Sequence, residues 1–73
     1  MSEESKNQRF KRLAEQRGNR ILKDIHLLGN LSNKNNYNYS DKEVNILFTA
    51  LENELRDTKW RFKTNNKRKE INL

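Results

Sequence analysis

The sequence predicts an all-α protein that folds as an antiparallel hairpin of two long amphipathic helices. Three observations indicate this fold class. Apolar residues recur at intervals of three and four in two separate segments, which is the spacing of one helix face. Proline is absent and glycine occurs only twice, so little interrupts a long helix. The chain has 73 residues, which is enough for one small domain.

The first helix is expected from about residue 5 to residue 28. Its apolar stripe covers about 120° of the helix circumference. Gly18 lies in this stripe, which is compatible with a close helix crossing or a bend. Gly29 is predicted to end the helix in a left-handed conformation, with Leu31 packing back on the last turn. The stripe contains Phe10, Ala14, Gly18, Ile21, Leu22, Ile25 and Leu28.

Residues 29–39 form the predicted bend. The stretch includes five asparagines, which tolerate positive φ and hydrogen-bond to their own backbone. Tyr37, Lys34 and the central asparagines have no assigned structural role. Two interpretations therefore stay open for this segment, a structural loop and a recognition loop.

The second helix is expected from Asp41 to about residue 64. Ser40 and Glu43 match a capping box, and Tyr39 and Val44 occupy the positions of a hydrophobic staple. The apolar positions step by three and four as in a heptad repeat. This seam contains Val44, Leu47, Phe48, Leu51, Leu55, Thr58 and Phe62.

Residues 1–64 would form the hairpin, and residues 65–73 a basic tail. A hairpin alone leaves the backs of both helices in water, and a chain of this size has marginal stability. Ile46, Ala50 and Trp60 lie off the main seam of the second helix. We therefore expect two copies to dimerise into a four-helix bundle.

The composition argues against several classes of function. Cysteine is absent and His26 is the only histidine, so no metal or cofactor site is expected. The chain has no Gly-rich phosphate loop and no nucleophile with a nearby base, so it is not expected to be an enzyme. No apolar run approaches the roughly 20 residues that span a bilayer. A cytoplasmic protein without membrane association is expected.

Basic residues are concentrated in the two terminal parts of the chain, which an antiparallel hairpin would bring together at the end away from the bend. The chain has 16 Lys and Arg against 10 Asp and Glu, a net charge of +6. Residues 6–23 contain seven basic residues and one acid, whereas residues 40–57 contain two basic residues and five acids. An antiparallel hairpin would bring the basic start of the first helix beside the basic end of the second.

This distribution predicts a partner rich in phosphate, namely nucleic acid or a nucleoprotein bound through its backbone and without base readout. A solvated helix face that only keeps the protein soluble is the simpler alternative. Trp60 lies among cations and could stack on an unpaired base. The predicted phosphate contacts are Arg9, Arg12, Arg20, Lys23, Lys59, Arg61 and Lys63.

Two other functions are compatible with the sequence. The protein could be a protein-binding adaptor or inhibitor that uses Ile46, Trp60 and Tyr37 as anchors, because aromatic residues are favoured at interfaces. It could also be a purely structural oligomer.

The run LLGNLSNKNNYNYSDKEVNILFTALENEL, followed by KWRF, resembles small uncharacterised open reading frames of low-GC Gram-positive bacteria and of their plasmids and phages. The twelve asparagines and nine lysines agree with such an origin. The resemblance implies a mobile-element protein and transfers no functional residue.

Overall fold

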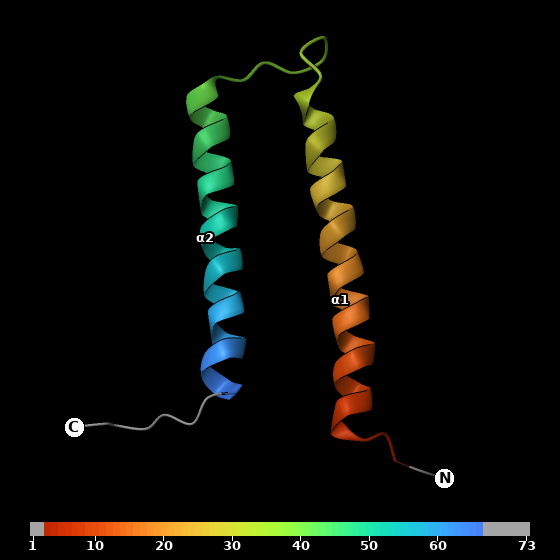
Figure 1. Ribbon diagram of the computed structural model, residues 1–73. Helices are drawn as coiled ribbons and strands as arrows, with labels where there is room; N and C mark the ends of the chain where they lie inside the picture. The colour runs from red at the N-terminus through yellow and green to blue at the C-terminus, as the bar shows by residue number, and fades with distance from the viewer. Residues whose placement is uncertain (1–2, 67–73) are drawn as a thin grey trace, which may run out of the picture. The chain divides into compact units, whose positions relative to one another are not determined.

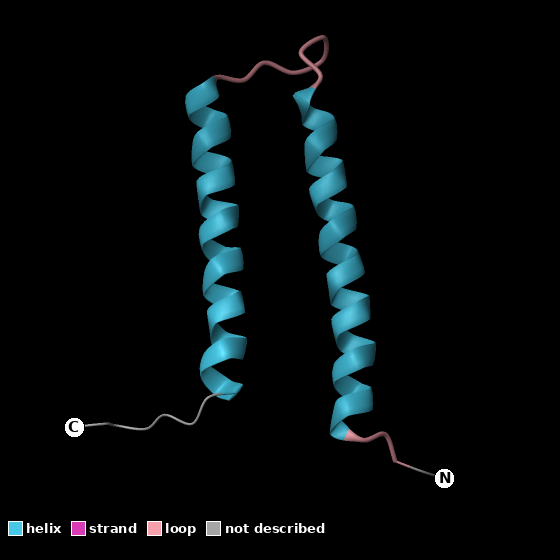
Figure 2. Cartoon of the chain, in the orientation of Figure 1, coloured by secondary structure: helices cyan, strands magenta, loops and turns pink. Residues whose placement is uncertain are grey.

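The computed structural model describes residues 3–66, which form two long α-helices (Figure 1). Helix α1 spans Lys6–Gly29 and helix α2 spans Asp41–Asn66, with a short 3-10 turn, η1, at Asn30–Ser32. Between residues 3 and 66 there is no strand (Figure 2). The predicted all-α class with two helices is therefore confirmed. The chain divides into two units after residue 38.

The helix bounds differ from the expected ones by one or two residues. Helix α1 continues to Gly29, one residue beyond the expected end, and α2 continues to Asn66, two residues into the expected tail. Residues 67–73, which make up most of the predicted basic tail, lie outside the described residues.

Helix α2 begins at a capping box formed by Ser40 and Glu43. The Glu43 backbone N–H donates to Ser40 Oγ at 3.1 Å, and the Ser40 backbone N–H donates to Glu43 Oε1 at 2.9 Å. These bonds satisfy backbone donors that have no partner inside the helix. Tyr39 and Val44 are both half-buried, as a hydrophobic staple requires. Local chemistry therefore defines where α2 starts.

Helix α1 begins with a second capping box, formed by Ser5 and Gln8. The Gln8 backbone N–H donates to Ser5 Oγ at 3.1 Å, and the Ser5 backbone N–H donates to Gln8 Oε1 at 2.9 Å. The pattern Ser-x-x-Gln is a known signal for such a cap. The spacing of apolar residues does not predict this cap, because the stripe of α1 begins only at Phe10.

The predicted left-handed conformation of Gly29 is wrong. Gly29 has φ −60° and ψ −27°, and no described residue has positive φ. The chain instead tightens into η1, where the backbone at the Asn30 cap donates to the carbonyls of Leu27 and Leu28. A 3-10 turn thus satisfies the last carbonyls of α1, so no left-handed residue is required.

Asn33 organises the turn that follows η1. Its side-chain Oδ1 accepts from the Asn35 backbone N–H at 3.0 Å, and its carbonyl accepts from the N–H groups of Asn36 and Tyr37 at 3.1 and 3.0 Å. The first of these bonds is an Asx turn, for which asparagine is favoured. Asn33 therefore has the structural role that the sequence left undecided.

The apolar face of each helix is exposed. No residue between 3 and 65 is buried. On α1, Phe10 and Ile21 are 54% and 56% exposed, and on α2, Leu51 and Leu55 are 42% and 69% exposed. Most of the stability of a helix in a protein comes from packing of its amphipathic face. Each helix therefore requires a surface that covers its stripe.

The substitution Gly29→Ala is expected to be tolerated. Gly29 has a right-handed conformation, and a Cβ at this position would meet no atom within 4 Å. Alanine should therefore stabilise the protein by up to about 1 kcal/mol, because it restricts the unfolded chain. Urea unfolding followed by circular dichroism measures the change. Gly18→Ala is the matched comparison, since Gly18 also has open space around it. A loss of stability in Gly29→Ala alone would contradict the right-handed conformation.

Acidification is expected to weaken the first turn of α2. Hydrogen bonds from the backbone N–H and the hydroxyl of Ser40 hold the pKa of Glu43 below its ordinary value of 4.5. The ionised carboxylate therefore stabilises the helix start at neutral pH, and this contribution is lost as the pH falls below 4.5 and through the lowered pKa. NMR Cα shifts of the first turn, followed down to about pH 3, measure the loss.

Glu43→Gln should flatten this pH profile, because glutamine keeps the cap but has no charge to lose. Glu52→Gln is the matched control, since it removes a carboxylate from the middle of the same helix. Identical profiles in the wild type and Glu43→Gln would show that Glu43 is not the responsible group.

Candidate nucleic-acid interface

Four of the predicted phosphate contacts, Arg9, Arg12, Arg20 and Lys23, lie on α1 and are exposed. At 100° per residue they fall within about 80° of the helix circumference. This sector is opposite the apolar stripe. We call these four residues the α1 row. A partner that covers the stripe therefore leaves the α1 row in water.

Glu4 forms a bidentate ion pair with one member of the α1 row. Arg12 Nε donates to Glu4 Oε2 at 2.9 Å, and Arg12 Nη2 donates to Glu4 Oε1 at 3.0 Å. Arg9 Nε lies 3.9 Å from Glu4 Oε1. The hydrogen bonds from Arg12 and its charge hold the pKa of Glu4 below its ordinary value. Glu4 therefore occupies the Nε and Nη2 donors of Arg12, with which a phosphate could otherwise make a bidentate contact.

On α2, a tryptophan and several charged residues share one surface, which we call the Trp60 surface. Trp60 is 64% exposed. Residues three and four positions apart are neighbours on a helix, which places cations on either side of the indole. Arg56 Nε lies 3.7 Å from Asp57 Oδ1, and both side chains are exposed. The surface consists of Arg56, Asp57, Lys59, Trp60 and Lys63.

The Trp60 surface includes one cation that the sequence prediction missed and excludes one that it named. Arg56 belongs to the surface, whereas Arg61 does not. Arg61 is two residues from both Lys59 and Lys63, so it lies roughly 200° around the helix from them. The spacing of Arg56 to Lys59 and Lys63, three and seven residues, could have identified it.

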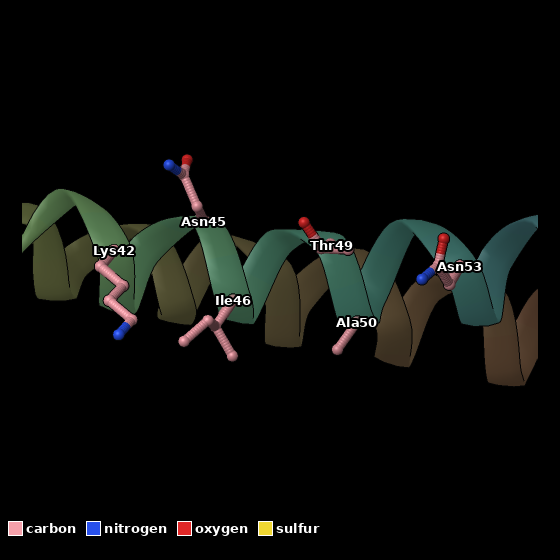
Figure 3. Close-up of a pocket in the computed structure, with 6 residues that line it drawn as sticks. All are labelled: Lys42, Asn45, Ile46, Thr49, Ala50 and Asn53. Atoms are coloured by element: carbon pink, nitrogen blue, oxygen red, sulfur yellow. The ribbon is translucent and has the colours of Figure 1, made fainter.

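Ile46 belongs to a different surface of α2 (Figure 3). Ile46 is 61% exposed, and it projects in the same direction as Ala50. Trp60 lies about 21 Å further along the helix at 1.5 Å per residue, so the two predicted anchors are on separate surfaces. The Ile46 surface is lined by Lys42, Asn45, Ile46, Thr49, Ala50 and Asn53. It is mostly neutral and so suits an apolar contact rather than phosphate.

Tyr37, the third predicted anchor, lies in the turn after η1. Its backbone N–H is bonded to Asn33, and the residue is 48% exposed. The turn therefore holds its backbone while much of the residue faces solvent.

Two further features bear on the kind of site present. Among residues 3–66, no group of three or more His, Asp or Glu side chains could hold a metal ion. Over the same residues, neither helix combines the length and the hydrophobicity that crossing a bilayer demands.

Comparisons of the chain with protein-family models, with curated proteins and with solved structures give no match. The resemblance to small bacterial open reading frames therefore stays a prediction.

Proposed function

We propose that this protein is a non-catalytic binding module that engages nucleic acid, or a nucleoprotein, through phosphate contacts. The observation that carries the proposal is the grouping of exposed cations into the α1 row and the Trp60 surface. Cations that neutralise phosphates release counterions, which drives binding without reading the base sequence. The contacting residues are Arg9, Arg12, Arg20, Lys23, Arg56, Lys59 and Lys63, with Arg56 taking the place of Arg61.

The two helices are proposed to pair antiparallel through their apolar faces. The half-exposed stripes support this pairing, because each needs a cover. The short connection between η1 and α2, residues 33–40, also supports it, since connections of this length commonly join antiparallel neighbours. Such a pairing would place the start of α1 beside the end of α2. The α1 row and the Trp60 surface would then lie at the same end of the hairpin.

A second copy of the chain is proposed to complete a four-helix bundle. The support for this dimer is the apolar area that one hairpin leaves over, chiefly the Ile46 surface and Leu27, which is 50% exposed. Four-helix bundles bury such leftover faces in a shared core.

A protein-binding adaptor or inhibitor is the second candidate function. It is favoured by the exposure of Ile46 and Trp60, at 61% and 64%, since apolar anchors of this kind dominate protein interfaces. This candidate predicts that neutralising the α1 row has little effect on the partner's affinity.

Replacing part of the α1 row is expected to weaken the salt dependence of duplex DNA binding. Each phosphate contact contributes about −0.9 to the slope of log affinity against log salt concentration. The double variant Arg20→Gln, Lys23→Gln should therefore make the slope less steep by about two units. Fluorescence anisotropy of a labelled short duplex over a series of salt concentrations measures it.

The double variant Lys11→Gln, Arg17→Gln is the matched control. It removes the same charge from the same helix, but both residues lie outside the α1 row. Equal slopes in the two double variants would indicate a general charge effect. A wild-type affinity that does not change with salt concentration would exclude phosphate binding.

Releasing Arg12 from Glu4 is expected to strengthen DNA binding. With Arg12 held by Glu4, six cations remain for phosphate and the slope should be about −5, whereas Glu4→Gln should bring it to about −6. The same anisotropy titration detects this change. Glu3→Gln is the control, because it removes an adjacent negative charge. A similar gain in both variants would assign the effect to net charge alone.

A further inference from the structure

We infer that the Trp60 surface binds an unpaired nucleotide, with the base stacked on the indole of Trp60 and the neighbouring phosphates held by Arg56, Lys59 and Lys63. This inference rests on the proposed phosphate-binding function and adds a preference for single-stranded nucleic acid. The α1 row has no aromatic member and gives no such preference.

The geometry of α2 brings an aromatic face and cations together within two helical turns. Arg56 precedes Trp60 by four residues and Lys63 follows it by three, so both are its direct neighbours on the helix. Lys59 and Lys63 are four residues apart and share a face. All of these residues line one surface, and the indole is 64% exposed. A flat ligand can therefore reach the ring while its charged groups contact the cations.

The charge of the surface selects the class of ligand. Three cations and one carboxylate, Asp57, surround the indole. The carboxylate is 3.7 Å from Arg56 in an exposed pair, and such pairs contribute little in water. A phosphate can therefore replace Asp57 as the partner of Arg56. A ligand that fits must carry a planar group close to an anionic group. A nucleotide with an unstacked base meets both requirements.

The backbone beneath Trp60 is held in a helical conformation to the end of α2. Thr64 Oγ1 donates to the Trp60 carbonyl at 3.0 Å and to the Arg61 carbonyl at 3.2 Å. These are bonds from a threonine hydroxyl back to carbonyls of the preceding helical turn. Trp60 is thus presented from a regular helix.

In a duplex the bases are stacked within the helix and their faces are covered, so the indole has no base to stack on. A single strand exposes base faces at every nucleotide, and stacking on aromatic side chains tolerates any base. The Ile46 surface provides a contrast on the same helix, because it has one cation, Lys42, and no aromatic ring.

The test uses the intrinsic fluorescence of Trp60, which is the only tryptophan in the chain. The full-length protein is titrated with an oligothymidylate of about ten nucleotides, a length in the range of known single-strand sites. Three comparison ligands are an abasic strand of equal length, a short duplex and a polyglutamate of equal charge. We expect oligothymidylate to quench the fluorescence and the abasic strand and duplex to leave it nearly unchanged.

Anisotropy of labelled strands then measures the role of the ring. Trp60→Ala should weaken oligothymidylate binding by about tenfold, and the effect on the abasic strand should be small. Trp60→Phe should retain most of the affinity because it keeps an aromatic face. Trp60→Phe is therefore the matched control for the loss of the ring. Circular dichroism verifies that each variant keeps its helices.

The alternative outcomes separate this inference from the proposed function. Equal, salt-dependent binding of the abasic strand and oligothymidylate without quenching would overturn base stacking and leave phosphate binding intact. No binding of any nucleic acid would overturn both. Quenching by polyglutamate but by no nucleic acid would also overturn both and assign the surface to an acidic protein.

Discussion

The exposed apolar stripe of each helix is the constraint on which the rest of this structure depends. Both helices are long and α2 starts at a well-formed cap, yet the stripe residues stay about half exposed. Isolated helices are marginal in water, and burying one Leu, Ile or Phe side chain contributes roughly 1.5 to 3 kcal/mol. Covering the stripes is therefore a condition for stability, and the way they are covered determines which charged faces remain in water.

The cations lie on helix faces that stay exposed when the stripes are covered. On α1, the α1 row is opposite the stripe. On α2, Trp60 is roughly 170° from the middle of the seam at 100° per residue. Packing along either stripe would therefore leave the candidate binding surfaces accessible. Pairing of the two helices along their stripes is therefore compatible with binding of a polyanion to the opposite faces.

Each candidate surface also carries a carboxylate of its own. Glu4 binds Arg12, and Asp57 lies beside Arg56. These pairs are exposed, so water and salt weaken them, and they hold the guanidinium groups in place without burying them. A phosphate that binds either arginine exchanges one anionic partner for another. If these surfaces bind phosphate as proposed, Glu4 and Asp57 lower their affinity for it.

Local patterns in the sequence determined most of the secondary structure. The spacing of apolar residues predicted two helices, and Ser40 with Glu43 predicted where α2 begins, because a capping box involves residues only three positions apart. The spacing of apolar residues does not predict the cap at Ser5 or the ion pair at Glu4, because both involve residues before Phe10, where the stripe begins. The cap at Ser5 is a local pattern that the sequence contains, whereas the Glu4–Arg12 pair spans eight residues and follows no helical spacing rule.

The geometry of the structure decided what composition could not. Glycine can adopt a left-handed or a right-handed backbone conformation. Gly29 is right-handed because a 3-10 turn supplies hydrogen-bond donors to the last carbonyls of α1. The phosphate contacts predicted from the sequence include Lys59, Arg61 and Lys63, and the phase of α2 shows that Arg56 shares a surface with Lys59 and Lys63. A count of charged residues along the sequence does not distinguish one face of a helix from another. Only the three-dimensional position of each side chain shows which cations can contact one ligand together.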